Sequence, residues 1–353
     1  MKVIIALLVI VDLVSGADKL SDDVLLLIKK AGYTGEVHQI ETVDGYLLKN
    51  HRVLPKSRTR QQFPVLLMHG ISLNSVDWLI AGPNRALAYY LADAGYDVWL
   101  GNARGNKYST DHKNLSTESH EFWNFSFHEM GIYDLPATID HMLHTTKSSK
   151  IFYIGHSQGG AAYLVCMSML PEYNEKVVQA HLLAPGAFVG HAANSIVPTV
   201  AAIINDGYFN NYAYIDFRNL FDLSNEISQM FCTGRPTPTN VAFCESIFFV
   251  IVGRNKNGIE TDRQVLKAVI PKFSPRTSVK QLAHFTQIHL SDKFESFDYG
   301  SESNVGNKST KPTQYPLENV KTPVYIYGAA EDTVIGRSVS VIFYLINFIY
   351  EKP

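Results

Sequence analysis

Residues 155–159, Gly-His-Ser-Gln-Gly, carry the clearest chemical signal in the chain. An apolar run at 150–154 precedes them and predicts a buried strand, and residues 160–165 predict a helix that begins with small side chains. A G-x-S-x-G turn between a strand and a helix lifts the serine hydroxyl out of the backbone, and a Cβ atom at either glycine would clash in so tight a turn. The same five-residue pattern also occurs in ordinary turns, but this context favours catalysis with Ser157 as the nucleophile.

The composition is that of an ordinary globular enzyme. The 353 residues are enough for one large α/β domain with an insertion, or for two domains. Hydrophobic residues make up 46% and charged residues 18%, which is typical of soluble enzymes. Because 31 basic residues nearly balance 33 acidic ones, nothing indicates a nucleic-acid partner or a membrane surface held by charge.

The first residues predict a signal peptide at 1–16. Lys2 is followed by an apolar run at 3–11, and small residues precede Ala17. The apolar run is too short to span a bilayer, so we expect no transmembrane span here. We expect the mature protein to begin near Ala17 and to enter the secretory pathway, with an extracellular or lysosomal destination.

The cysteines and the glycosylation triplets fit that compartment. Cys232 and Cys244 lie close in sequence and are predicted to form a disulfide that closes a small loop, whereas Cys166 is predicted to be a buried free thiol. Triplets of the form Asn-x-Ser predict glycosylation at Asn114, Asn124 and Asn307.

Strand-like and helix-like segments alternate through most of the chain. We predict a hairpin over 33–48 with its turn at Asp44-Gly45, strands at 63–68, 96–101, 150–154, 178–185 and 323–328, and helices at 84–94, 133–143 and 160–165. This alternation predicts an α/β fold with a mainly parallel, doubly wound sheet. The rhythm breaks at about 186–309, which we interpret as a helical cap or lid inserted between core segments 17–185 and 310–353.

Several stretches together resemble the acid lipase family of α/β-hydrolases, which includes gastric and lysosomal acid lipases and their insect relatives. They are residues 67–70 (Leu-Met-His-Gly), 97–106, 122–127, 133–137 and 155–160. The resemblance runs from about Gly32 to about Asp332. It implies an α/β-hydrolase core, a mobile lid over the nucleophile, and hydrolysis of neutral lipid esters at a lipid–water interface, with no metal or organic cofactor.

The resemblance also implies a role for individual residues. Ser157 would attack the ester carbonyl and form an acyl-enzyme. The oxyanion would be held by the backbone N–H of Gln158, which follows the nucleophile, and by that of Ile71, which follows a strand end. Asp332, just past the last predicted strand, would be the triad acid that orients a histidine. His69 is interpreted as a structural residue that shapes the turn before Ile71.

The triad histidine has no match in the sequence. The order in this fold is Ser, Asp, His, yet no histidine follows Asp332. The residues from about 336 onwards are largely apolar and unlike the family, so we expect the C-terminus to be truncated or altered. His284 and His289 are interpreted as structural residues of the cap, and the side chain of His156 is expected to point away from the serine hydroxyl. No histidines pair at the spacing of metal ligands, so we expect no metal site.

Three functional hypotheses remain open. The first is a secreted lipase for triacylglycerol or sterol esters whose C-terminal end is altered, and the intact motifs upstream of Asp332 favour it. The second is a lipase-like isoform that binds lipid without hydrolysing it, because a serine without a base is a weak nucleophile. The third is an esterase for small esters that uses another base.

Overall fold

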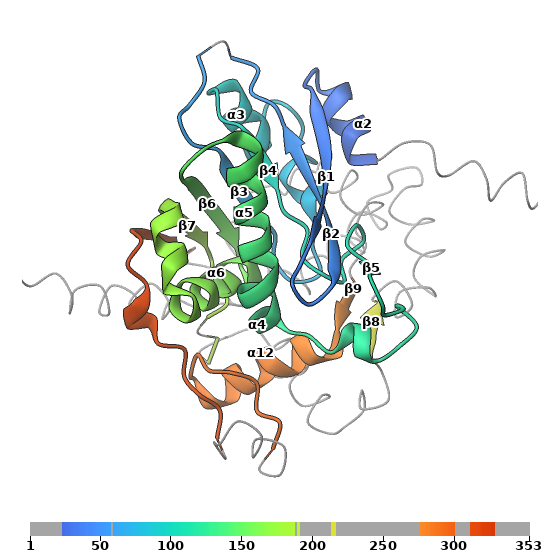
Figure 1. Cartoon of the computed structure of the whole chain (residues 1–353), viewed down its shortest axis with the longest axis vertical. Helices are drawn as coiled ribbons and strands as arrows, with labels where there is room; N and C mark the ends of the chain where they lie inside the picture. Colours follow the sequence, from blue (N-terminus) through green and yellow to red (C-terminus); the bar gives the residue numbers. More distant parts are fainter. Residues whose placement is uncertain are drawn as a thin grey trace, which may run out of the picture.

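An eight-stranded sheet forms the centre of the structure (Figure 1). The computed structural model describes residues 23–57, 59–187, 189–190, 213–216, 276–300 and 311–328. The sheet strands are β1 (Gly35–Glu41), β2 (Tyr46–Val53), β3 (Val65–Met68), β4 (Val98–Leu100), β5 (Asp111–His112), β6 (Ile151–His156), β7 (Val177–Leu183) and β10 (Val324–Tyr327). They run in the order β1-β2-β4-β3-β6-β7-β10, and β5 pairs with β2 beside this path.

The strands of the predicted doubly wound core pair with one another in parallel. β3 pairs in parallel with β4 and β6, and β7 pairs in parallel with β6 and β10. β1 and β2 form the predicted antiparallel hairpin, and its turn contains Gly45 at a φ of 95°. Because β6 lies inside the parallel set, its carboxyl end reaches the sheet edge where ligands of such sheets usually bind.

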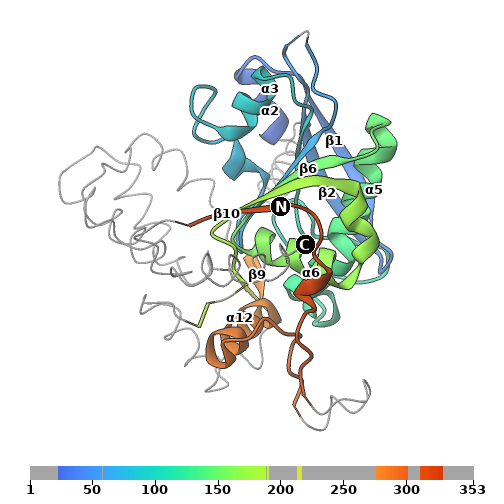
Figure 2. The same cartoon turned by 90° about the vertical axis from the view of Figure 1, so that its left-hand side faces the viewer.

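Helices cover both faces of the sheet (Figure 2). They are α2 (Asp23–Lys30), α3 (Leu87–Asp93), α4 (Phe127–Glu129), α5 (Leu135–Thr146) and α6 (Gln158–Met169), together with α12 (Val279–Ser291) in the predicted insertion. Alternate residues of β3 enter two separate apolar clusters, since Leu66 packs with the α5 and α6 side and Leu67 with the α2 and α3 side. The doubly wound α/β prediction is confirmed.

The helix that follows the elbow is buried along almost its whole length. Every residue from Gln158 to Ser168 is buried. Gly131, in the π-helical turn before α5, lets this helix approach, because a Cβ atom there would lie 2.7 Å from Cβ of Val165. Cys166 on α6 is buried and free, as predicted, and burial raises the pKa of its thiol.

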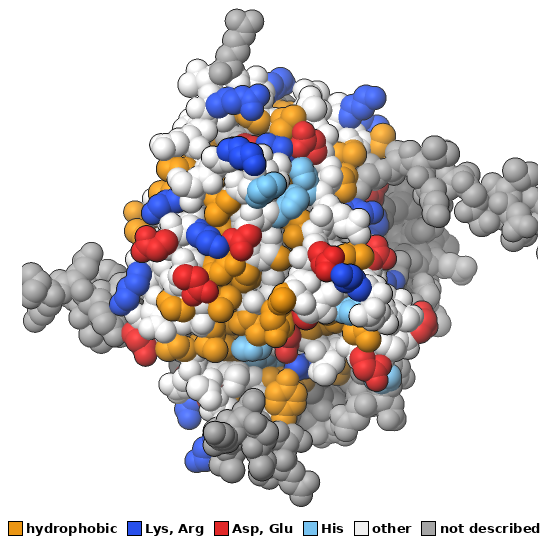
Figure 3. Space-filling view, in the orientation of Figure 1, with side chains coloured by type: hydrophobic (Ala, Val, Ile, Leu, Met, Phe, Trp, Pro, Cys, Tyr) orange, Lys and Arg blue, Asp and Glu red, His pale blue; other side chains and the backbone are white. Residues whose placement is uncertain are grey.

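Some sequence predictions fall on residues outside the described part. These are the signal peptide at 1–16, Cys232, Cys244, Asn307, Asp332 and the tail from about 336. Asn114 and Asn124 are described, and both are exposed. In the described ranges, no helix has the length and apolarity needed to cross a bilayer, and no three potential metal-binding side chains cluster. Acidic and basic side chains are interspersed over the face shown in Figure 3.

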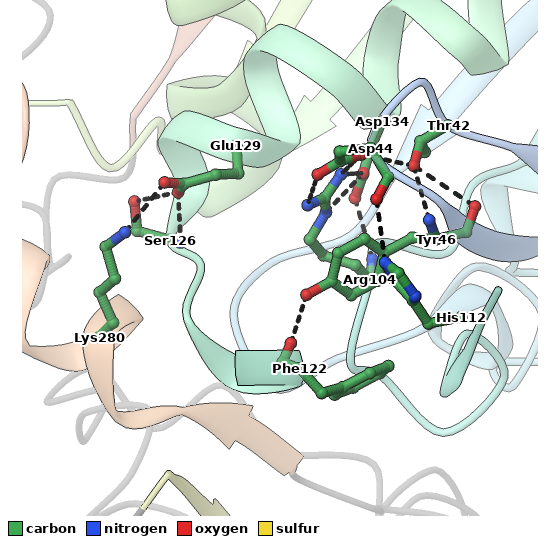
Figure 4. A network of polar contacts seen from close by, with 10 residues as sticks. All are labelled: Thr42, Asp44, Tyr46, Arg104, His112, Phe122, Ser126, Glu129, Asp134 and Lys280. Atoms are coloured by element: carbon green, nitrogen blue, oxygen red, sulfur yellow. Dashed lines mark hydrogen bonds and ion pairs between the residues drawn. The ribbon is translucent and has the colours of Figure 1, made fainter. Parts of the chain in front are cut away.

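A buried arginine joins the hairpin to the helical side of the core (Figure 4). Arg104 is 2% exposed and forms ion pairs with Asp44 in the hairpin turn and with Asp134 before α5. Its guanidinium also lies 3.9 Å from the centre of the Tyr46 ring. These contacts hold the segment after β4 in place. Burial alone would lower the pKa of Arg104, but the two carboxylates outweigh it and hold that pKa above its ordinary value.

Replacing Arg104 tests whether this ion triad supports the fold. Arg104→Ala leaves Asp44 and buried Asp134 without their counter-charge, so we expect the free energy of unfolding to fall by about 3–5 kcal/mol. Urea denaturation measures it. The control is Lys113→Ala, which removes an ion pair to Glu41 whose side chains are 54% and 53% exposed and which should change stability by about 1 kcal/mol or less. Equal effects of the two substitutions would contradict a structural role for the triad.

Candidate active site

Ser157 lies in a strained turn between β6 and α6. Its φ of 51° and ψ of −114° are rare for a residue with a side chain. Hydrogen bonds hold the turn on both sides: the Ser157 N–H donates to Leu183 O at 2.9 Å, and Ser157 O accepts from the N–H groups of Gly160 at 2.9 Å and Gly186 at 3.1 Å. The side chain stays partly exposed. This is the geometry of a nucleophile elbow.

The glycines around Ser157 are required by close backbone contacts. A Cβ atom on Gly159 would lie 2.6 Å from Met68 O and 2.9 Å from His69 O. A Cβ atom on Gly155 would lie 2.7 Å from the ring of Tyr153. No side chain fits at either position without a shift of its neighbours, so the elbow packs directly against the end of β3.

The two residues predicted to bind the oxyanion lie beside the nucleophile. Gln158 begins α6, where backbone N–H groups have no partner within the helix. Ile71 follows Gly70, and a Cβ atom on Gly70 would lie 3.2 Å from Cβ of Ser157. Neither the Gln158 nor the Ile71 backbone N–H donates a hydrogen bond to any other described residue. The turn after β3 and the start of α6 therefore meet at Ser157.

His69 uses both ring nitrogens inside the protein. Nε2 faces two donors, the Ala103 N–H at 3.1 Å and the Asn106 side-chain amide at 3.0 Å, while Nδ1 lies 2.7 Å from Gly70 O. Since the first two groups can only donate, Nε2 is the acceptor and Nδ1 carries the proton. Burial lowers the pKa of His69 to about 4. This neutral, fully bonded imidazole supports the structural interpretation of His69.

The other histidines near the core are also held by specific contacts. His284 bonds to Ser126 Oγ and Glu295 O, both at 2.9 Å, and burial lowers its pKa to about 4. Nδ1 of His289 lies 2.8 Å from Val189 O. The ring of His156 lies beside Gly70, with Nδ1 3.0 Å from where a Cβ atom on Gly70 would be.

β10 is the last strand in the described part of the chain, and it ends beside the elbow. The Ala184 N–H donates to Tyr327 O at 2.7 Å, directly beside Leu183, whose carbonyl holds Ser157. The chain therefore leaves β10 close to the nucleophile. Asp332 follows shortly afterwards in sequence and lies outside the described residues.

An ion pair joins the predicted insertion to the core near the elbow (Figure 4). Lys280 on α12 contacts Glu129 on α4 at 3.0 Å, and their side chains are 10% and 16% exposed. Glu129 also accepts from the backbone N–H of Ser126 at 2.7 Å, which caps α4. Ser278, the N-cap of α12, donates to Phe125 O at 2.6 Å. The described part of the insertion is therefore anchored to residues 125–129.

Sequence comparisons agree with this geometry. Residues 64–343 match the α/β hydrolase fold family, and residues 25–82 match the partial α/β-hydrolase lipase region. Lipase 1 of Drosophila melanogaster is 40% identical over 307 residues, which cover 87% of this chain and 66% of that protein. Human gastric triacylglycerol lipase is 31% identical over 353 residues, which cover 96% of this chain and 85% of that protein. This chain belongs to the acid lipase family of α/β-hydrolases.

Membership places the chain among the hydrolases and, within them, the ester hydrolases. The chain spans slightly less than two thirds of Lipase 1 and 78% of Drosophila melanogaster Lipase 3, with which it shares 39% identity over 313 residues. Among solved structures, a soluble variant of Saccharomyces cerevisiae monoglyceride lipase has a TM-score of 0.50 at 17% identity, covering 87% of this chain and 81% of that one. At that identity the likeness concerns the fold.

Two asparagines of this lipase-family chain have a role at the site that our sequence analysis did not assign. Asn102 and Asn106 are buried, and both lie in the stretch 97–106 that carries the family resemblance. Asn106 contacts His69, and Asn102 bonds to the backbone N–H of Ser75 in the segment after Ile71. The sequence feature that could have indicated this role is a pair of asparagines directly after a predicted strand, because amides that become buried there need hydrogen-bond partners.

The Glu129–Lys280 pair predicts how stability depends on pH. Burial alone would raise the pKa of Glu129, but Lys280 and His128 outweigh it and lower that pKa from 4.5 to about 2. Because the pKa is lower in the folded state, the stabilisation is complete above pH ~5 and is lost as the pH falls toward 2. We expect Glu129→Gln to cost up to about 3 kcal/mol near neutral pH, and less at pH 3.

Urea unfolding of the wild type and Glu129→Gln between pH 6 and pH 3 tests this dependence. Glu118→Gln is the control because Glu118 is exposed, and its difference from the wild type should stay small throughout. A difference between wild type and Glu129→Gln that stays constant with pH, or grows as the pH falls, would contradict the assignment.

Proposed function

We propose that this chain is a secreted lipase that hydrolyses carboxylic esters of neutral lipids, triacylglycerol or sterol ester, through an acyl-enzyme on Ser157. One observation carries the proposal: the serine stands in a strained elbow against which the turn before Ile71 packs. In that arrangement the backbone N–H groups of Ile71 and Gln158 stabilise the tetrahedral oxyanion. The lipase relatives support an ester of a lipid as the substrate.

Asp332 is the proposed triad acid, and we assign no histidine of this sequence to the triad. The position of β10 supports Asp332, since this strand ends beside Leu183, whose carbonyl holds Ser157, and Asp332 follows five residues after Tyr327 in sequence. No histidine follows Asp332. His69 and His284 are buried, and contacts engage both ring nitrogens of each. The nucleophile would then rely on the elbow and the oxyanion donors, a combination that leaves about 10³–10⁴-fold catalysis in triad-deficient serine proteases.

The secretory pathway is the proposed location. The predicted signal peptide at 1–16 and the predicted disulfide between Cys232 and Cys244 support it. Asn114 and Asn124 are exposed, as glycosylation requires. Within this proposal, the segment 186–309 acts as the cap or lid that admits lipid to Ser157.

A lipase-like protein that binds lipid without hydrolysing it is the second candidate. The engagement of both ring nitrogens of His69 and of His284 in structural contacts favours it, because neither imidazole then has a nitrogen left to serve as a base. The two candidates share the same lipid site and differ only in the reactivity of Ser157.

Labelling with a fluorophosphonate probe separates these candidates. We expect slow labelling of the secreted wild-type protein, because the elbow and the oxyanion donors are present without a base, and no labelling of Ser157→Ala. Ser168→Ala is the control, since Ser168 is buried on the same helix and donates to Val165 O; its labelling should match the wild type. Absence of labelling in folded wild-type protein would favour lipid binding alone. Rapid labelling would show that a base exists and would contradict the missing histidine.

A further inference from the structure

The side-chain amide of Asn106 has only one orientation that satisfies its surroundings. Its Oδ1 accepts from the backbone N–H groups of Tyr108 at 2.9 Å and Ser109 at 3.1 Å. Because those groups can only donate, the amino end must point the other way. There it donates to Nε2 of His69 at 3.0 Å and to Oδ1 of Asn102 at 2.8 Å. Asn106 is 5% exposed, so water does not replace these partners easily.

This orientation selects one tautomer of His69. Nε2 receives the Asn106 amide and the Ala103 N–H, so it carries no proton. Nδ1 then carries the proton and donates it to Gly70 O at 2.7 Å. In the other tautomer, an N–H on Nε2 would face two donors, and an unprotonated Nδ1 would face the carbonyl oxygen.

The hydrogen bond to Gly70 O acts on the oxyanion hole directly. Gly70 O and the N–H of Ile71 belong to the same planar peptide group, in which they point in opposite directions. Holding the carbonyl toward the imidazole therefore aims the Ile71 N–H to the opposite side. The Leu73 N–H also donates to Gly70 O, at 3.2 Å, and completes the turn.

Asn102 ties this arrangement to the rest of the core. Its Oδ1 accepts from Asn106 and from the Ser75 N–H at 2.9 Å, and its amino group donates to Lys49 O at 2.6 Å. The backbone N–H of Asn102 donates to Oδ1 of Asn50 at 2.8 Å. Asn102 thus links Asn106 to β2, while Asn106 contacts His69 on the side of the active site.

We propose that Asn106 is a positioning residue for the oxyanion hole: it fixes the tautomer of His69, which in turn orients the Gly70–Ile71 peptide toward the carbonyl oxygen of the ester. The proposal rests on the function proposed above for Ser157 and adds a residue that touches neither the substrate nor the nucleophile. Loss of one oxyanion donor typically slows the chemical step by about 10²–10³-fold.

The test is Asn106→Asp, which keeps the shape but reverses the contact with His69. One carboxylate oxygen still accepts from Tyr108 and Ser109. The other places an acceptor opposite Nε2 of His69 and Oδ1 of Asn102, which both receive a donor from Asn106 in the wild type. In fluorophosphonate labelling, we expect the maximal rate of inactivation to fall about a hundredfold. The probe concentration at half-maximal rate should change by less than about threefold, because binding of the probe is not altered.

Asn50→Asp is the matched control. Asn50 is buried in the same network, so the change in charge and shape is identical. In Asn50→Asp, one carboxylate oxygen would still accept from the Asn102 N–H. In the wild type the Thr138 hydroxyl accepts from the Asn50 amide at 3.1 Å, and in the variant this hydroxyl can donate to the other carboxylate oxygen. Asn50 makes no contact with His69 among the bonds of the described residues. An equal loss of labelling rate in both variants would overturn the proposal, since a buried charge alone would then explain it.

A second measurement reads the tautomer without any reaction. Long-range ¹H–¹⁵N spectra of histidine-labelled protein, with His69 assigned by comparison with His69→Gln, should show the proton on Nδ1 in the wild type and in Asn50→Asp. In Asn106→Asp the proton should appear on Nε2, because the carboxylate favours an N–H there. Unchanged His69 signals in Asn106→Asp, or an Nε2 proton in the wild type, would overturn the proposal.

If the wild type does not label but the tautomer changes as expected, the catalytic function fails while the positioning by Asn106 stands.

Discussion

The backbone hydrogen bonds around Ser157 are the constraint on which the site depends. A residue with a side chain combines a φ of 51° with a ψ of −114° only where its surroundings compensate the strain. Here Leu183 O on β7 and the N–H groups of Gly160 and Gly186 hold the turn from both sides. The elbow is therefore a product of the parallel sheet, because β7 must lie beside β6 at the right register to supply Leu183 O.

One short segment after β4 connects this elbow to the rest of the core. Ala103 and Asn106 set the state of His69, while Arg104 between them holds Asp44 and Asp134 through buried ion pairs. The segment thus supports both the oxyanion turn and the packing of the hairpin against the helical side. A buried charge network is costly to break, so the position of this segment is strongly determined.

The predicted insertion contacts the core through both polar and apolar groups. α12 meets the core through the Glu129–Lys280 pair, the Ser278 cap and the His284 bonds, and its Ile288 packs in the main apolar cluster. Ring contacts add to them, with His284 stacked at 4.0 Å on Phe127. Polar anchors of this kind depend on protonation state, so the core and the α12 contact are expected to differ in their sensitivity to acid.

The sequence by itself determined the parts of this protein that depend on local pattern. The alternation of apolar strands and helices predicted the doubly wound sheet. The Gly-x-Ser-x-Gly pattern predicted a tight turn at Ser157 between a strand and a helix, because such a turn restricts which residues fit. Boundaries were less accurate: the predicted hairpin strand ended at 48 and β2 continues to Val53, since β1 and β4 both pair with its last residues. The roles of Asn102, Asn106 and the Arg104 triad were decided only in the tertiary structure. Asn106 also has local partners in Tyr108 and Ser109, but the contacts that define these roles reach groups 27 to 60 residues away along the chain. No local pattern indicates which distant groups a buried amide or guanidinium will meet.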